Sequence, residues 1–118
     1  MRRDAKVLIV DVLTALERLR RFTLDKGFDD YAADEILRSA VERQLAIVGE
    51  ALWRLRTVDP RSVHRIRDID RIVAFRHVLV HGYATVDDRL VWGIVEGRLA
   101  DLAADARACL DALGAADP

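Results

Sequence analysis

The sequence predicts an all-α protein, an up-and-down bundle of four main helices, and three observations carry this prediction. Apolar residues recur every three to four positions over almost all of the 118 residues, which is the period of an amphipathic helix. No segment alternates between apolar and polar residues as a half-buried strand does. The connections between the periodic segments are short, so consecutive helices are expected to be antiparallel neighbours.

The first helix is expected over residues 4–26, where the apolar stripe begins at Leu8. Gly27 follows as the glycine that commonly stands just beyond a helix end, and residues 28–31 form a short connector. The second helix starts at an aspartate cap, either Asp30 or Asp34, and runs to about residue 56.

The stripe of this second helix is apolar apart from one residue, Gln44. A buried amide needs a hydrogen-bond partner, so Gln44 is expected either to form a structural hydrogen bond or to line a site. The apolar positions of the stripe are Leu37, Val41, Leu45, Val48, Leu52 and Leu55.

Pro60 interrupts the pattern, and a third helix is expected from about residue 61 or 62 to about Val80, ended by Gly82. Asp87 can cap a fourth helix that continues to about residue 113. Its expected core positions are Val91, Val95, Leu99, Leu102, Ala106, Cys109 and Leu113.

Length and composition restrict the class of protein. Residues 1–118 are expected to form one domain, with 113–118 as a frayed tail. The formal net charge of −1 excludes a strongly basic nucleic-acid coat protein, although residues 54–76 hold seven arginines against three acidic residues. The single cysteine and the lack of a signal-like segment favour the cytoplasm, and no apolar run approaches the roughly 18 residues of a membrane span.

The segment 76–83 gathers the residues with the most distinctive chemistry: Arg76, His77, His81 and Tyr83. An arginine within an apolar helical stripe is costly unless it is paired or bound to a ligand. Arginine binds phosphate through two hydrogen bonds, and histidine transfers protons near neutral pH, so the segment predicts a phosphate site. The plainer alternatives are surface histidines and an arginine in a structural ion pair with Asp68, Asp70 or Glu50.

Helix geometry sets a condition on this site. At about 100° per residue, Arg76 and His81 point about 140° apart on one continuous helix. Both reach one phosphate only if the helix unwinds near Gly82 or if two copies of the chain meet at the helix. His77 and His81 share a flank, but no third ligand and no E-x-x-H motif is evident, so no metal is expected.

The residues Arg76, His81 and Tyr83 match the pattern R-x-x-x-x-H-x-Y of HEPN-domain toxins of the HepT type. The segment 43–51, RQLAIVGEA, is similar to the family's second-helix signature R-N-L-x-I-I-G-E-A, and Val91-Trp92 resembles its fourth-helix opening. The resemblance extends over about residues 5–112. Two residues depart from the pattern: His77, where the family usually has Asn or another small polar residue, and Gln44 in place of Asn.

The resemblance implies a HEPN-like bundle that forms a homodimer, with the motifs of two copies facing a shared cleft. It implies a toxin that is a metal-independent endoribonuclease of tRNA or mRNA, with Arg76 and His81 as catalytic residues and no cofactor of its own. It also implies a partner, a minimal nucleotidyltransferase (MNT) antitoxin that uses ATP to attach AMP to Tyr83. A charged, bulky AMP beside the cleft would block RNA.

The residues fit RNA cleavage on chemical grounds as well. His81 suits proton transfer and Arg76 suits stabilisation of the phosphorane, while His77 is either a second proton-transfer group or a plain surface histidine. Arg65, Arg67 and Arg71 are expected to guide the RNA backbone. The alternative function is a non-catalytic helical module that binds nucleotides or a partner beside a nucleotidyltransferase.

Overall fold

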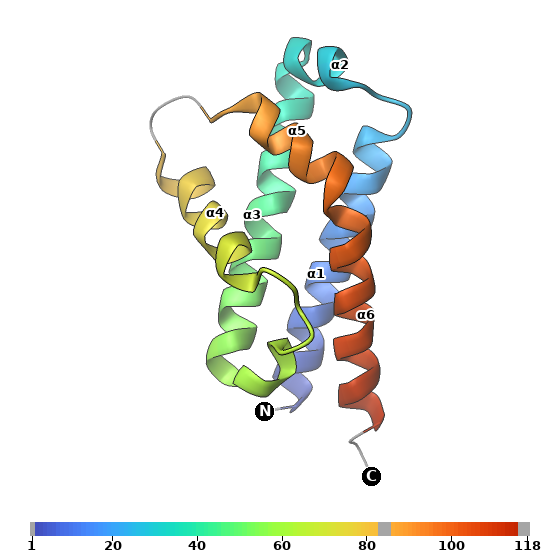
Figure 1. Ribbon diagram of the computed structural model, residues 1–118, viewed down its shortest axis with the longest axis vertical. Coiled ribbons are helices and arrows are strands. Elements are labelled where there is room, and N and C mark those ends of the chain that lie inside the picture. Colours follow the sequence, from blue (N-terminus) through green and yellow to red (C-terminus); the bar gives the residue numbers. More distant parts are fainter. Residues whose placement is uncertain (1, 83–85, 116–118) are drawn as a thin grey trace.

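The computed structural model describes residues 2–82 and 86–115, and within these ranges it contains helices and no strand (Figure 1). The predicted all-α, up-and-down bundle is therefore confirmed. The elements in chain order are α1 (Arg2–Thr23), α2 (Phe28–Ala33), α3 (Glu35–Val58), the 3₁₀ helix η1 (Pro60–Val63), α4 (Ile69–His81), α5 (Asp88–Gly97) and α6 (Leu99–Ala115).

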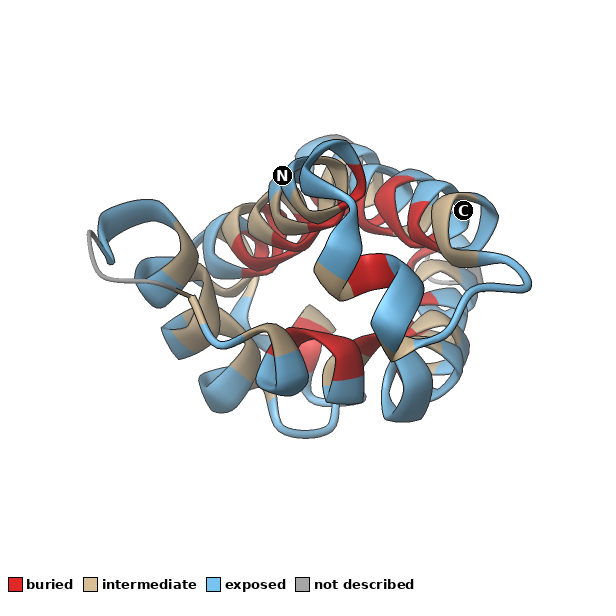
Figure 2. Ribbon diagram, turned by 90° about the horizontal axis from the view of Figure 1, so that it is seen from above, coloured by how far each residue is buried: buried red, intermediate tan, exposed pale blue. Residues whose placement is uncertain are grey.

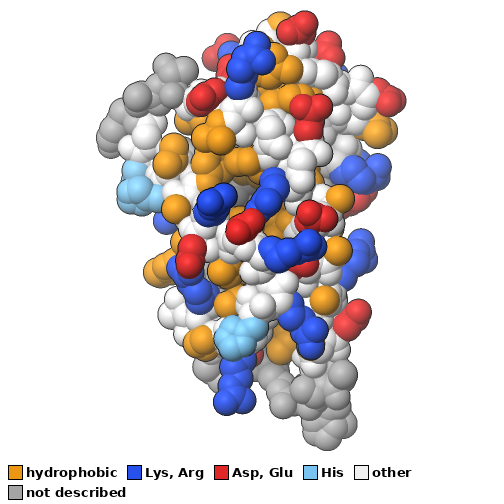
Figure 3. Space-filling model, viewed as in Figure 1, with side chains coloured by type: hydrophobic (Ala, Val, Ile, Leu, Met, Phe, Trp, Pro, Cys, Tyr) orange, Lys and Arg blue, Asp and Glu red, His pale blue; other side chains and the backbone are white. Residues whose placement is uncertain are grey.

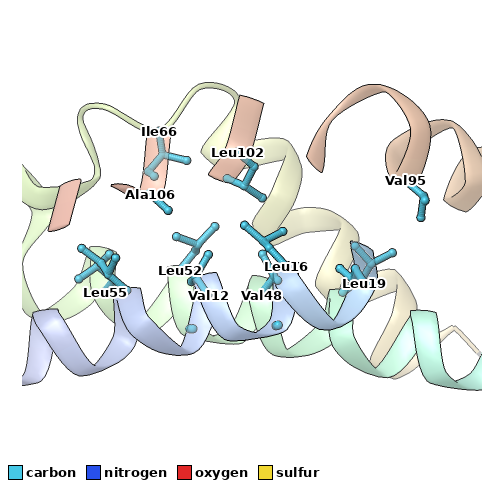
Figure 4. Packing of buried hydrophobic residues seen from close by; sticks show 14 of the residues in the cluster. Val12, Leu16, Leu19, Val48, Leu52, Leu55, Ile66, Val95, Leu102 and Ala106 are labelled. Atoms are coloured by element: carbon cyan, nitrogen blue, oxygen red, sulfur yellow. The ribbon is translucent and has the colours of Figure 1, made fainter. Parts of the chain in front are cut away.

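The core lies between α1, α3 and α6, whose buried side chains face one another (Figures 2 and 4). All six apolar positions predicted for the second helix are buried on α3. Burial of each such side chain stabilises the folded state by roughly 1.5–3 kcal/mol, so the contact of these three helices is the main source of stability. The largest fully buried members of the core include Ile9, Leu19, Tyr31, Leu52 and Leu55.

Two of the predicted helix caps are confirmed. Leu37 donates its backbone N–H to Oδ1 of Asp34 over 3.0 Å, at the start of α3. Arg89 and Leu90 donate theirs to Oδ1 of Asp87, at the start of α5. Both aspartates satisfy amide groups that have no partner within the first helical turn.

The prediction that Gly27 ends the first helix is wrong. The last helical residue of α1 is Thr23, and the left-handed conformation beyond it is adopted by Asp25, with φ of 58°. Gly27 instead precedes α2, a short helix over the expected connector, and donates its N–H to Asp30. Aspartate tolerates the left-handed region better than most residues, so it can take the place of glycine here.

The third helix begins later than predicted, at Ile69. Pro60 opens the 3₁₀ helix η1, and residues 64–68 form an irregular segment that ends at Asp68 in the left-handed region (φ 58°). Arg67 fixes this segment to α6 by donating from its backbone N and its guanidinium to Asp105. The ion pair of Arg67 with Asp105 therefore stabilises a non-helical segment for which apolar periodicity alone predicts helix.

The fourth helix is also not continuous as predicted. It divides at Arg98 into α5 and α6, and α5 crosses the end of the bundle at an angle to α6 (Figure 1). Trp92 of α5 thereby reaches Tyr31 of α2, with their ring centroids 5.2 Å apart. Arg98 forms an ion pair with Asp68, so the break also contacts the segment before α4.

Helix α4 is peripheral, because it packs mainly on α3 and none of its residues is buried. Gly49 permits this contact: a Cβ atom at Gly49 would lie 2.3 Å from Cβ of Arg76. The outer apolar residues Val78 and Val80 stay 48% and 49% exposed. The helix that carries the predicted site is thus held against one neighbour and is open on its other sides.

Candidate functional site

Arg76 lies in a groove of about 330 Å³ between α1, α3 and α4. The sequence placed it within a buried apolar stripe, but the stripe of α4 is only partly covered and the Arg76 side chain is 28% exposed. The lining of the groove includes apolar residues, among them Ile47 from α3 and Val80 from α4. A guanidinium at this position is desolvated in part and remains reachable from solvent.

Glu50 is the partner of Arg76 in the described structure, with Nη2 and Oε2 2.6 Å apart. Of the three partners considered from the sequence, Glu50 is thus the one found. The other two are engaged elsewhere: Asp70 binds Arg56 and Asp68 binds Arg98. Oε1 of Glu50 also accepts a hydrogen bond from Nε of Arg54 over 3.1 Å, so one carboxylate serves two arginines.

This ion pair is incomplete as a hydrogen-bonded unit. Nε of Arg76 and Oε2 of Glu50 are buried atoms without a hydrogen-bond partner among the described residues. The short contact between Nη2 and Oε2 therefore supplies charge attraction without good hydrogen-bond geometry. A buried guanidinium N–H left without an acceptor is costly, so Arg76 gains from any shift of its side chain that brings this N–H to a further anion.

His77 and His81 contact each other instead of Arg76. Their ring centroids are 4.7 Å apart with the planes inclined by 48°, and both side chains are exposed. Helix α4 continues to His81 without unwinding, so the divergence of about 140° between Arg76 and His81 persists within one copy. Among the described residues, no group of three or more His, Cys, Asp or Glu is arranged to hold a metal ion.

The segment 76–83 is described only as far as Gly82. Tyr83 falls outside the described residues 2–82 and 86–115. Gly82 closes α4 as predicted, with its N–H donated to the carbonyl of Val78 over 2.9 Å. A Cβ at Gly82 would approach that carbonyl oxygen to 2.6 Å, so the chain leaves the helix here only because this residue has no side chain.

Gln44 takes neither of its two expected roles within the described chain. Its Oε1 atom is buried without a hydrogen-bond partner, and it does not line the groove of Arg76.

Arg67 and Arg71, expected to guide RNA, line a different and larger groove of about 520 Å³ between α4, α5 and α6. Its lining is largely apolar and includes Phe75, and Figure 3 shows this face with apolar side chains bordered by charged ones. The guanidinium of Arg67 is engaged by Asp105, and this hydrogen bond lowers the pKa of the Asp105 carboxyl. Arg65, the third of these arginines, is exposed.

Sequence reasoning missed two arginines that lie with Arg76. Arg43 and Arg54 line the same groove from α3. They stand eleven residues apart, three helical turns, with Glu50 between them on one face. This spacing is visible in the sequence, on the side of the helix opposite its apolar stripe.

The chain is similar to a known protein family and to several curated proteins over most of its length. The model of the family "Ribonuclease HepT-like" matches residues 12–109. A "Probable ribonuclease HepT" of Thermococcus cleftensis is 31% identical over 96 residues, covering 81% of this chain and 86% of that protein. A "Putative RNase" of Methanocaldococcus jannaschii is 32% identical over 95 residues, covering 80% of this chain and 86% of that protein.

A third relative, also from Methanocaldococcus jannaschii, is named "Gamma-glutamylcyclotransferase and putative RNase". It is 30% identical over 96 residues, but the matched region is 81% of this chain and only 43% of that protein. No solved structure matches the chain significantly. Of the helices described, none is long and apolar enough to cross a membrane. The match over residues 12–109, on a fold of helices only, shows that the chain belongs to the ribonuclease HepT-like family.

Proposed function

We propose that this protein is a metal-independent endoribonuclease that acts as a homodimer, with Arg76 and His81 as its catalytic residues. The observation that carries the proposal is the position of Arg76, whose guanidinium lies in an open groove with a buried Nε that has no hydrogen-bond partner among the described residues. Membership of a ribonuclease family makes the phosphodiester of RNA the fitting anion.

The proposed reaction needs only the 2′-hydroxyl of RNA and protein side chains. A base takes the 2′-hydroxyl proton, the 2′-oxygen attacks phosphorus in line, and the 5′-oxygen leaves after it receives a proton. His81 performs one of the two proton transfers, and Arg76 stabilises the charge of the phosphorane through two N–H groups. His77, whose ring contacts that of His81, is the candidate for the second proton transfer.

A second copy of the chain can bring a His81 to Arg76, although the two side chains of one copy point about 140° apart on α4. In a two-fold dimer built on this helix, His81 of one copy approaches Arg76 of the other. The exposure of Val80 supports such a contact, since it is an apolar residue left uncovered on the side of α4 that carries Arg76. The active site in this proposal belongs to the pair and is incomplete in a single chain.

We further propose that the protein, a single domain over residues 1–118, is the cytoplasmic toxin of a toxin–antitoxin pair. Its partner is an MNT nucleotidyltransferase that uses ATP to place AMP on Tyr83. The motif R-x-x-x-x-H-x-Y supports this, because Tyr83 follows the end of α4 and stands two residues from His81. The added phosphate would repel RNA from the adjoining cleft.

The catalytic assignment is tested with Arg76→Ala and His81→Ala. Each variant should lose cleavage of total tRNA in the presence of a chelator by at least about a hundredfold, the scale expected for loss of one stabilising or proton-transfer group. Circular dichroism should show unchanged helicity, because neither side chain belongs to the core. Arg61→Ala, an exposed arginine on η1, is the matched control. Full activity of either site variant would refute the assignment.

The regulatory assignment is tested with Tyr83→Phe in co-expression with the nucleotidyltransferase. We expect the unaltered chain to gain the mass of one or more AMP units and the phenylalanine variant to gain none, because it lacks the accepting hydroxyl. The variant should also remain active on RNA. A gain of AMP at the same stoichiometry would show that the modified residue lies elsewhere.

The non-catalytic alternative is favoured by one observation, the ion pair of Arg76 with Glu50, which already neutralises the guanidinium in the free chain. A module that only binds nucleotide or partner would leave tRNA intact at any protein concentration. Incubation of the purified protein with total tRNA, with and without chelator, separates the two functions.

A further inference from the structure

The groove of Arg76 holds an uneven set of charges. Three arginines line it, Arg43, Arg54 and Arg76, against two carboxylates, Asp11 and Glu50. Glu50 is shared between Arg54 and Arg76, and no ion pair of Arg43 is found within the described part of the chain. The groove is therefore positive overall and has guanidinium N–H groups to spare, since each arginine has five.

The three arginines are also arranged along a line. Arg43 and Arg54 lie about 16 Å apart along α3, at 1.5 Å per residue, and Arg76 approaches from α4 beside Glu50, which stands between them in the sequence. A compact single anion would meet only one or two of these groups. A chain of anions, such as a polynucleotide backbone, can contact all three.

Glu50 occupies the place where such an anion would bind. Its two oxygens contact Arg54 at 3.1 Å and Arg76 at 2.6 Å, in the way that two oxygens of a phosphate would. The Glu50 side chain is 32% exposed, although its Oε2 is buried, so it can turn out of the groove without crossing the core. Oε2 loses no well-formed hydrogen bond when it does so, and the bond lost is the one that Oε1 accepts from Nε of Arg54.

We propose that Arg43, Arg54 and Arg76 form a phosphate track for single-stranded RNA along the outer face of α3, and that RNA displaces Glu50 from the two arginines it holds. The proposal rests on the ribonuclease function proposed above and specifies how that site binds its substrate. It places the principal RNA contact on the side of α4 that carries Arg76, whereas Arg67, in the larger groove, is engaged by Asp105.

The track is tested by RNA binding in the His81→Ala background, so that cleavage does not interfere. Fluorescence anisotropy with a single-stranded RNA oligonucleotide gives Kd at several salt concentrations. Arg43→Ala and Arg54→Ala should each weaken binding several-fold and reduce the salt slope by about 0.7, the value for one phosphate contact on a single strand. Arg43→Lys should retain the slope because it retains the charge, and Arg61→Ala should bind unchanged.

Glu50→Gln should change RNA binding in the direction opposite to the arginine variants. Glutamine keeps the shape of the side chain but removes the charge that competes with phosphate, so binding should tighten several-fold. Weaker binding by Glu50→Gln would show that Glu50 positions the arginines for RNA and would overturn the displacement. Thermal unfolding of each variant checks that the fold is retained.

Cleavage assays separate failure of the track from failure of the function. In the otherwise unaltered enzyme, Arg43→Ala and Arg54→Ala should raise KM and leave kcat within about twofold, the pattern of lost binding shared by ground and transition states. Normal Kd and KM in both variants, with cleavage still dependent on Arg76, would overturn the track alone. Cleavage that is independent of Arg76 and His81 would overturn the proposed function itself.

Discussion

Gly49 sets the distance between the helix that bears Arg76 and the rest of the bundle. Its missing side chain lets Cβ of Arg76 occupy the space that an alanine methyl would need, 2.3 Å from the Cβ position. Gly49→Ala should therefore force α4 away from α3 and lower the free energy of unfolding by about 1–3 kcal/mol, as overpacking does. Urea unfolding followed by circular dichroism measures this loss.

Gly93 is the matched control, since it lies within α5 and a Cβ there would meet nothing within 4 Å. Gly93→Ala should raise the free energy of unfolding by about 0.5–1 kcal/mol, because alanine loses less backbone entropy in a helix. Equal destabilisation by the two variants would show that helix propensity, and not the contact with Arg76, explains the effect at Gly49.

At this scale the sequence predicted which acids could pair with Arg76 but not which of them does. Glu50 was among the three acids considered for Arg76, but helix periodicity cannot choose between acids on different elements. Arg76 pairs with Glu50 because α4 packs on α3 at Gly49, next to Glu50 in the sequence. The grouping of Arg43 and Arg54 with Arg76 depends on the same crossing, and a prediction from one helix at a time does not contain it.

Among the helices, apolar periodicity located each main segment but not every boundary. The stripe of α3 and the caps at Asp34 and Asp87 were predictable because each depends on neighbours in sequence. The late start of α4 depends on the distant pair of Arg67 and Asp105, thirty-eight residues apart. The break at Arg98 directly follows Gly97, a local signal that apolar periodicity does not use, and the contact of Arg98 with Asp68 joins residues thirty positions apart.

The pair of Arg67 and Asp105 predicts a pH dependence for the segment before α4. The hydrogen bond from Arg67 lowers the pKa of Asp105 in the folded state, so the stabilisation is present above the ordinary carboxyl pKa of about 3.9 and is lost as pH falls through the lowered value. Asp105→Asn should therefore lower the urea midpoint at pH 7, and its difference from the unaltered chain should shrink below about pH 4.

Asp101→Asn is the control for this effect, because Asp101 lies 3.8 Å from the same guanidinium and is 62% exposed. Exposed pairs of this kind contribute little, so its urea midpoint should stay close to that of the unaltered chain. A constant difference for Asp105→Asn between pH 3 and pH 7 would mean that the pair does not stabilise the segment through its charge.

For the whole molecule, the decisive property is the uncovered side of α4. Val80 borders the groove of Arg76 and is 49% exposed, so a second copy seated there would bury it. Val80→Glu should convert the proposed dimer to a monomer in sedimentation velocity and abolish RNA cleavage, while helicity persists. The charge would be desolvated in the dimer, and because Val80 also lines the groove of Arg76, sedimentation velocity is the measurement that tests the dimer itself.

Ile36 provides the comparison, because it is an apolar residue on α3 that is 83% exposed and lies outside the groove. Ile36→Glu should leave both sedimentation and cleavage unchanged. An active monomer of Val80→Glu would exclude a site that is shared between copies.

The isolation of α4 has a consequence for how this fold diversifies. Since none of its residues is buried, its outward positions can be replaced with little penalty in folding free energy. Those same positions surround the proposed reacting groups. Substitutions on this one exterior helix can therefore change the proposed site while the three-helix interior stays constant.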